Sequence, residues 1–116
     1  IVGSNYADVL VAGAPGGTIM GGNGADLLEG SRSGGTTLIN NGTGNDTFCA
    51  ADVCAVAGTG ASDLPGAQPD TMIGGSGNDN FFARNGIADN INGGGGYNSA
   101  QVDPADKLVS IQQLLP

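Results

Sequence analysis

The sequence predicts an all-β solenoid, in which short strands stack in parallel around a narrow core and little or no helix forms. Two observations carry this prediction. Glycine supplies 23 of the 116 residues, yet hydrophobic residues make up 39% of the chain, a fraction within reach of globular proteins. The glycines also recur in register, because residues 21–29, 41–49 and 74–82 follow the nine-residue pattern G-G-x-G-x-D-x-U-x, where U is apolar. Such a repeat is typical of a parallel β-helix and makes residues 1–116 a single domain.

Charge and residue content exclude several classes of function. The formal net charge is −8, from 11 acidic and 3 basic residues, and the chain has no histidine. So acidic a chain has no basic patch for phosphate backbones, and we expect no nucleic-acid partner. Without histidine, Ser-His-Asp and Cys-His catalysis and the common zinc and haem sites are excluded, and we expect no enzyme activity. No run of 18 apolar residues occurs, so we expect no membrane insertion.

Weaker copies extend the repeat to both ends of the chain. Residues 3–11 keep the pattern at positions one, six and eight, and residues 93–101 carry Asn98 in place of the aspartate. In each nonapeptide the first six residues are expected to form a turn and the last three a strand, so that position eight faces inward and positions seven and nine face outward. The predicted inward side chains are Leu10, Ile19, Leu28, Leu38 or Ile39, Phe48, Met72, Phe81, Ile91, Ala100 and Leu108 or Val109.

The turns fall into two columns, because two nonapeptides make one coil and consecutive turns then lie on opposite edges. The motif-like turns are residues 3–8, 21–26, 41–46, 74–79 and 93–98. The degenerate turns are residues 12–17, 30–36, 50–70, 83–89 and 102–107. In the degenerate column Asp70 and Asp89 are the residues that stand at a plausible position six.

The three close copies resemble the calcium-binding nonapeptide repeats of the repeats-in-toxin (RTX, hemolysin-type) family, and the likeness covers nearly the whole chain. The resemblance implies a right-handed parallel β-roll of about five coils, with calcium as its cofactor. The residue types agree with that implication. Glycines allow carbonyl oxygens to converge, the aspartate adds a carboxylate, and two stacked turns together can supply the 6–8 oxygen ligands that calcium takes.

Five motif turns leave four gaps between them, so we expect about four calcium ions in a ladder on one edge. The predicted ligands are the carboxylates of Asp8, Asp26, Asp46 and Asp79, the carbonyls of Gly22, Gly24, Gly42, Gly44, Gly75, Gly77, Gly94 and Gly96, and the amide oxygen of Asn98. The Asn98 site is expected to be the weakest, and the first turn departs from the pattern at Ser4 and Tyr6. The alternative is that each aspartate is a turn residue without metal, and this interpretation is favoured at Asp89.

Folding is expected to depend on the ion. The core is one side chain wide, and stacked carboxylates about 4.8 Å apart repel by roughly 3–4 kcal/mol at an effective dielectric constant of 20. Calcium reverses the sign of that interaction. We therefore expect a largely unfolded chain without calcium and folding at millimolar, extracellular calcium.

Two segments depart from the repeat. Residues 50–69 are expected to form an inserted loop, preceded by Cys49, which stands at an outward position. A Cys49–Cys54 disulfide would indicate an oxidising compartment, and the alternative is two free thiols. Residues 102–116 give a turn, a last strand and an apolar tail, which forms a cap or an assembly segment, while the N-terminus is expected to have no cap. Head-to-tail stacking, a fragment of a longer array, and a tail that folds back all fit these ends.

Three functions from different classes remain. The first is a secreted, self-assembling building block of an extracellular filament, surface layer or adhesin. The second, implied by the resemblance, is a repeat module of a secreted protease, lipase or alginate epimerase that assists secretion and folding. The third is a module that binds acidic polysaccharide through calcium. All three imply a secreted, extracellular or cell-surface location, and the resemblance implies a bacterial one.

Overall fold

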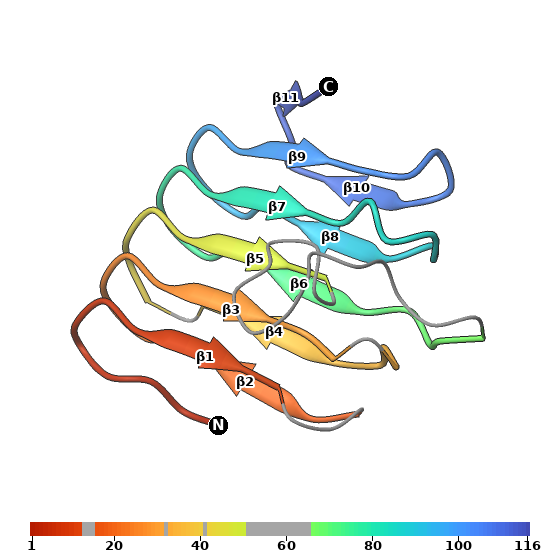
Figure 1. The fold of residues 1–116 in the computed structure, drawn as a ribbon. Helices are drawn as coiled ribbons and strands as arrows, with labels where there is room; N and C mark the ends of the chain where they lie inside the picture. Colours follow the sequence, from red (N-terminus) through yellow and green to blue (C-terminus); the bar gives the residue numbers. More distant parts are fainter. Residues whose placement is uncertain (13–15, 32, 41, 51–65) are drawn as a thin grey trace.

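The computed structural model describes residues 1–12, 16–31, 33–40, 42–50 and 66–116, and within them it is an all-β parallel roll without helices (Figure 1). Most strands have three residues, as the repeat predicts. The strands are β1 (Val9–Val11), β2 (Thr18–Met20), β3 (Leu27–Glu29), β4 (Thr37–Ile39), β5 (Thr47–Cys49), β6 (Thr71–Ile73), β7 (Asn80–Phe82), β8 (Asn90–Asn92), β9 (Ser99–Gln101), β10 (Lys107–Val109) and β11 (Gln113–Leu114). No helix of membrane-spanning length and hydrophobicity occurs in these ranges.

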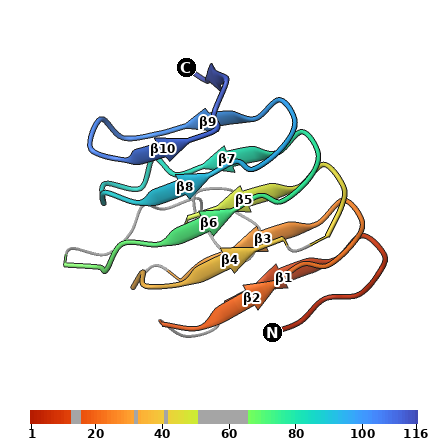
Figure 2. The same ribbon diagram turned by 180° about the vertical axis from the view of Figure 1, so that it is seen from behind.

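Odd and even strands separate into two parallel sheets. One sheet has the order β1-β3-β5-β7-β9-β11, and the other has the order β10-β8-β6-β4-β2. The chain thus passes from one sheet to the other at every turn, and each coil adds one strand to each sheet. Figures 1 and 2, which view the roll from opposite sides, show each sheet in front in turn.

The repeat also fixes the register of the strands. Leu28, Phe48 and Phe81 are consecutive partners in one sheet, and Leu38 and Met72 are partners in the other. All five side chains are fully buried, and the rings of Phe48 and Phe81 stack with centroids 4.7 Å apart. The inward faces of the two sheets therefore form one continuous column of core side chains.

The predicted inward residues are confirmed in the middle of the roll and are more exposed at its ends. Leu38 rather than Ile39 is the buried member of its pair, and Leu108 rather than Val109 is in register with the core residue Ile91. Leu10 is partly buried, and Leu108 is 36% exposed. A terminal coil has a neighbouring coil on one side only, which explains this gradient.

The chain leaves the repeat between β5 and β6. Residues 51–65, with Cys54, lie outside the described residues, so the Cys49–Cys54 pairing stays a prediction. Cys49 itself is disulfide-bonded and fully buried, and it lies outside the hydrophobic core cluster that contains its neighbour Phe48. It lies in register between Glu29 and Phe82, in a stack where Glu29 is also buried. On the far side of the insertion, Gln68 accepts a hydrogen bond from Gly35 N–H at 3.0 Å through its backbone carbonyl.

The N-terminus, which was expected to have no cap, covers one strand edge at its end of the roll. Ile1 and Gly3 pair with the free edge of β2, where Met20 N–H donates to Ile1 O at 2.9 Å and Gly3 N–H donates to Met20 O at 2.7 Å. At the other end β11 covers β9, and Ile111 packs against the core. The N-terminal pairing was missed because residues 1–3 carry no strand pattern of their own.

Candidate metal site

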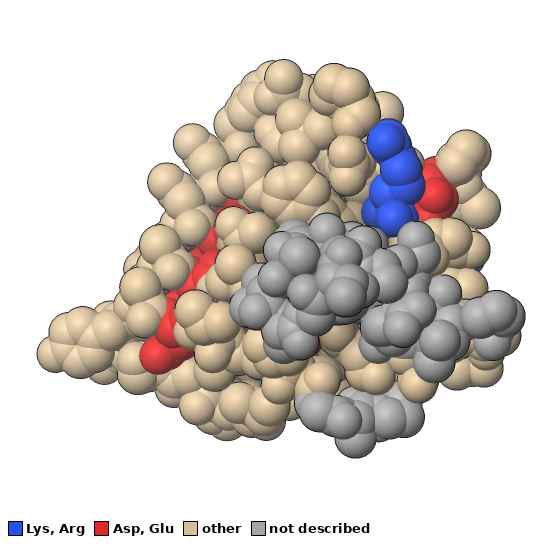
Figure 3. All heavy atoms as spheres, in the orientation of Figure 1, with Lys and Arg blue, Asp and Glu red and all other residues tan. Residues whose placement is uncertain are grey.

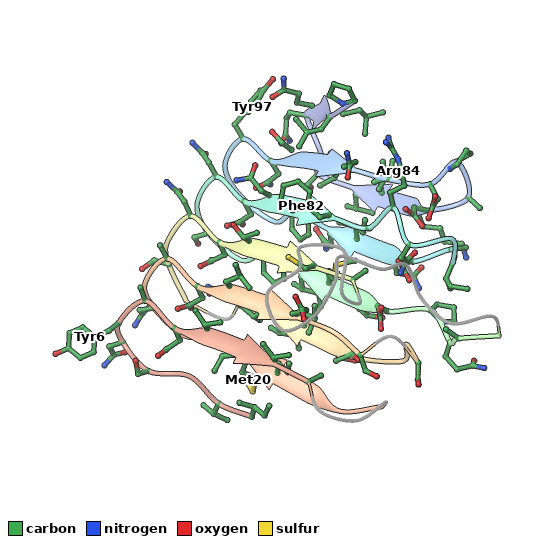
Figure 4. The ribbon with its side chains drawn as sticks, in the orientation of Figure 1. Tyr6, Met20, Phe82, Arg84 and Tyr97 are labelled. Carbon is green, nitrogen blue, oxygen red and sulfur yellow. The ribbon has the colours of Figure 1, made fainter. Side chains whose placement is uncertain are left out.

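The five motif turns lie along one edge of the roll, called here the motif edge (residues 3–8, 21–26, 40–46, 74–79 and 93–98). This edge is on the left in Figure 1, and a line of acidic atoms runs across the coils on that side in Figure 3. Tyr6 and Tyr97 project from its first and last motif turns in Figure 4 and are 79% and 55% exposed. The predicted one-sided alignment of these turns is therefore present in the fold.

The position-six side chains bind the backbone of the preceding turn. Asp46 N–H donates to Asp79 Oδ1 at 2.8 Å, and Asp26 N–H donates to Asp46 Oδ1 at 2.8 Å. The same contact joins Asp8 to Asp26 at 2.9 Å and Asp79 to Asn98 at 2.9 Å. Asp26, Asp46 and Asp79 thus each use one carboxylate oxygen to hold adjacent coils together, which is a charge-assisted structural role.

Gln112 completes this series and was not predicted. Its Oε1 accepts a hydrogen bond from Asn98 N–H at 2.7 Å. Because Gln112 follows β10 and belongs to no motif turn, the nonapeptide pattern gave no signal for it.

The surroundings of the second carboxylate oxygen differ between the turns. Ser4 N–H and Ser4 Oγ donate to Asp8 Oδ2 at 2.6 and 2.9 Å. The Asn40 amide donates to Asp46 Oδ2, and also to Asp26 Oδ2 at 3.4 Å. Asp79 Oδ2 is buried and has no hydrogen-bond partner. An unpaired buried carboxylate oxygen costs several kcal/mol unless an ion or a donor compensates it, on the order of the penalties known for buried charges.

The contrast is explained by the first residue after each preceding strand. The register of β2, β4 and β6 places Asn40 level with Gly21 and Gly74. At Gly74 a side chain is impossible, because a Cβ there would collide with Asp79 Oδ2. Asn40 instead brings an amide donor to Asp46 and Asp26, whereas Gly74 supplies no side-chain donor to Asp79.

Asn98 presents the opposite group from the one expected. Its Oδ1 is taken by Asp79 N–H, and its Nδ2 donates to Gly95 O at 3.2 Å and Ser110 O at 3.1 Å. An amide donor directed at carbonyl oxygens performs the electrostatic role of a cation. An ion at this turn would therefore have to replace these two hydrogen bonds.

Carbonyl oxygens of the motif glycines point along the stacking direction. A Cβ on Gly77 would collide with Gly44 O, and a Cβ on Gly44 would collide with Gly24 O. Gly77 also has a φ of 115°, in the region that favours glycine. These contacts place the Gly24 and Gly44 carbonyls in the gaps between turns.

The other predicted glycines line the same edge with different contacts. The Gly42 and Gly75 carbonyls already accept the N–H groups of Ser76 and Gly95, at 3.4 and 2.9 Å. Gly22, Gly94 and Gly96 sit over the backbone oxygens of the neighbouring turn, where a Cβ would collide. Not all eight predicted carbonyls are therefore equally available to an ion.

Burial controls the charge state of the central aspartates. Burial raises the pKa of Asp79 to about 6, the Asp46 N–H hydrogen bond opposes this shift, and the charge of Asp46 adds to it. Burial likewise raises the pKa of Asp46. Both shifts show that a negative charge is disfavoured here, which is the condition that a bound cation relieves.

The types of oxygen donor on the motif edge match those of a hard cation that takes part of its ligands from the backbone. No three acidic or thiol side chains of the described residues converge on one point, so carbonyl oxygens must supply the remaining ligands. Asp79 Oδ2 and the Gly44 and Gly77 carbonyls are of the type that calcium prefers.

An outer row of asparagines also joins the motif turns. Asn78 N–H donates to Asn45 Oδ1 at 2.9 Å, and Tyr97 N–H donates to Asn78 Oδ1 at 2.9 Å. Asn45 and Asn78 stand at position five, which the pattern treats as variable, so their role was missed.

Among known proteins, no family model, no curated protein and no solved structure matches the chain.

Proposed function

We propose that this chain is a calcium-binding β-roll of the RTX type, which folds when it meets extracellular calcium and serves as a structural building block outside the cell. The observation that carries the proposal is Asp79 Oδ2, which is buried without a partner between stacked turns. In this carboxylate Oδ1 accepts a hydrogen bond from Asp46 N–H, and a cation bound at Oδ2 would neutralise the remaining charge.

Calcium suits this position better than a smaller or softer ion. The available donors are carboxylate and carbonyl oxygens, and calcium accepts 6–8 such ligands in a flexible geometry. Magnesium requires near-ideal octahedral geometry and keeps most of its water, which suits a narrow gap between two backbone turns poorly. Thiolate-binding ions lack ligands here, because Cys49 is disulfide-bonded.

The ions are fewer than the four gaps suggest. Asn40 already compensates Asp46, Ser4 compensates Asp8, and the Asn98 amide occupies the last turn. We therefore assign the strongest site of the motif edge to Asp79 Oδ2 in the turn of residues 74–79.

The building-block role is supported by the two ends of the roll. Among the described residues, no further strand pairs with the outer edges of β1 and β11 in one sheet or of β10 in the other. Val9, Val109 and Leu114 expose 65%, 57% and 63% of their surface at these ends. Unlike, unpaired ends favour addition of a second copy in the same direction, which forms a filament.

Two experiments test the proposal. Isothermal titration of the full chain with calcium is expected to show binding that Asp79→Asn weakens at least tenfold. Asp8→Asn, a matched change at a turn where serine satisfies the carboxylate, is expected to keep most of the affinity. Equal affinities for the two variants would contradict the site. Electron microscopy with calcium and with chelator tests assembly, and monomers in both conditions would contradict the building-block role.

A further inference from the structure

The turn between β7 and β8, beside Arg84 in Figure 4, contains the step Asn85–Gly86. At an Asn–Gly step the backbone nitrogen of the glycine can attack the side-chain amide carbon of the asparagine and form a succinimide, because glycine has no side chain to obstruct the attack. The part of the chain that the structure describes holds three such steps, Asn23–Gly24, Asn85–Gly86 and Asn92–Gly93. Their contacts differ, so the structure distinguishes their reactivity.

The attacking nitrogen of the Asn85 step is bonded to a carboxylate. Gly86 N–H donates to Asp103 Oδ2 at 2.8 Å, and Asp103 lies in the turn between β9 and β10 of the neighbouring coil. A carboxylate at this distance can accept the proton as the nitrogen attacks, which is the geometry required of a general base. The stacking of two coils therefore supplies a base to this step.

The other two steps have a neutral acceptor at the same place. Gly24 N–H donates to Thr43 O at 2.9 Å. Gly93 N–H donates to Val109 O, also at 2.9 Å. A backbone carbonyl accepts the hydrogen bond but does not take up the proton at neutral pH, so it holds the nitrogen without activating it.

The side-chain carbonyl of Asn85 has a donor of its own. Ile87 N–H donates to Asn85 Oδ1 at 3.0 Å. This oxygen carries negative charge in the tetrahedral intermediate, and a backbone N–H directed at it stabilises that charge. Asn92 has the same contact from Gly94 N–H at 3.0 Å, so the base, rather than this donor, distinguishes the two steps.

The three glycines also differ in the space around them. Ring closure requires the glycine backbone to move, and a Cβ on the exposed Gly86 would meet nothing within 4 Å. A Cβ on Gly24 would collide with the backbone of Tyr6, and one on Gly93 would collide with Ser110 O. Of the three steps, the one that has the base is also the one whose glycine is not enclosed.

We propose that Asn85 is a self-modification site, at which Asp103 of the neighbouring coil acts as general base for conversion of the asparagine to a succinimide. Gly86 N forms a bond to Asn85 Cγ while its proton passes to Asp103 Oδ2. The bond from Cγ to Nδ2 then breaks, and the amide nitrogen takes that proton and leaves as ammonia. Water hydrolyses the ring and gives aspartate or isoaspartate at residue 85.

The product weakens the contact between the two coils. Asn85 is buried beside the Asp89 carboxylate, and its backbone N–H donates to Asp103 Oδ2 at 3.0 Å. A new carboxylate at this position is repelled by both aspartates. The reaction needs the stacked coils but no metal ion, so it does not rest on the proposed calcium site.

Peptide mass spectrometry of the full chain, incubated at neutral pH in saturating calcium, measures the conversion at each step. A positioned general base contributes typically about 10²–10⁴-fold, so we expect Asn85 to convert at least about tenfold faster than Asn92 of the same chain. Asp103→Asn is expected to lower the Asn85 rate to near that of Asn92. Asp8→Asn, the same change at the motif edge, is expected to leave the Asn85 rate unaltered. An Asp103→Asn chain that converts Asn85 as fast as the original chain would overturn the role of Asp103.

The unaltered chain in urea provides a measurement that does not depend on how well a variant folds. Unfolding separates Asp103 from Gly86, so the three steps are expected to convert at similar rates in urea, with Asn85 slower than in the folded chain. An Asn85 rate in the folded chain that is equal to or below its rate in urea would overturn the proposal.

Discussion

The amide of Asn40 donates to the carboxylate of Asp46, whereas Gly74, at the same level of the next coil, supplies no donor to Asp79. This contact satisfies the Asp46 carboxylate without a metal ion. Removal of the Asn40 amide should therefore make the stability of this turn depend on calcium. We expect Asn40→Ala to lower the free energy of unfolding by about 1–3 kcal/mol at low calcium, because Asp46 Oδ2 loses its donor.

The measurement is urea unfolding at a low and at a high calcium concentration. High calcium is expected to restore part of the loss. Asn80→Ala, which alters an exposed asparagine of β7, serves as the control and is expected to change stability by less than about 0.5 kcal/mol. Equal stability of Asn40→Ala and the control would contradict the role assigned to Asn40.

Gly77 is required by its backbone conformation and by the carbonyl of Gly44. We expect Gly77→Ala to destabilise the fold by at least about 1–3 kcal/mol, since alanine at a φ of 115° is strained and its Cβ would collide with Gly44 O. Gly17→Ala is the matched change in open space and is expected to be nearly neutral. Thermal unfolding in saturating calcium compares the two, and a similar midpoint for both would contradict the stacking of the carbonyls.

Phe48 and Phe81 are the largest fully buried side chains of the described residues, and their rings stack in the core. Phe81→Ala is expected to cost about 3–5 kcal/mol, because it leaves a cavity between fully buried neighbours. Tyr97→Ala, at an exposed ring, removes a similar volume without a cavity. Denaturant unfolding distinguishes them, and a loss at Phe81 no larger than that at Tyr97 would show that this core is not packed as described.

Acid is expected to stabilise the calcium-free fold. The folded-state pKa values of Asp70 and Asp79 are raised from 3.8 to about 6, and that of Asp89 to about 7, so the folded state holds protons that the unfolded state releases. Below about pH 4 these carboxyls are protonated in both states and do not destabilise the fold. As pH rises from about 4 to the folded-state pKa values of 6 to 7, the free energy of unfolding decreases, by about 1.4 kcal/mol per unit of pKa shift.

Circular dichroism in chelator at a series of pH values measures this effect. The strand signal is expected to increase as pH falls from 7 to 5, and Asp79→Asn is expected to reduce that increase. A strand signal that decreases over this range would contradict the assignment.

The nonapeptide period predicts much of the fold because it sets which residue faces inward. Phe48 and Phe81 could be placed in one stack from spacing alone, and the two-edge arrangement followed from the alternation of turns. The insertion between Cys49 and Thr71 did not shift the register, since a solenoid tolerates extra residues in a turn.

The chemistry of individual turns was harder to predict. The turn from β4 to β5 is one residue longer than that from β2 to β3, spanning residues 40–46 instead of 21–26, so the motif alignment put Asn41 where the register puts Asn40. Asp106 was missed because its turn has no glycine pattern, although it stacks with Asp89. The position of Asn40 and the stacking of Asp106 both depend on which residues of adjacent coils lie at the same level. A motif that describes one repeat does not contain that information.

The most direct test of the central claim is a calcium titration of the full chain, started in chelator and followed by far-ultraviolet circular dichroism. We expect little strand signal in chelator and a cooperative rise at millimolar calcium, with the rise weakened in Asp79→Asn. Full strand content in chelator at neutral pH, unchanged by calcium, would contradict it.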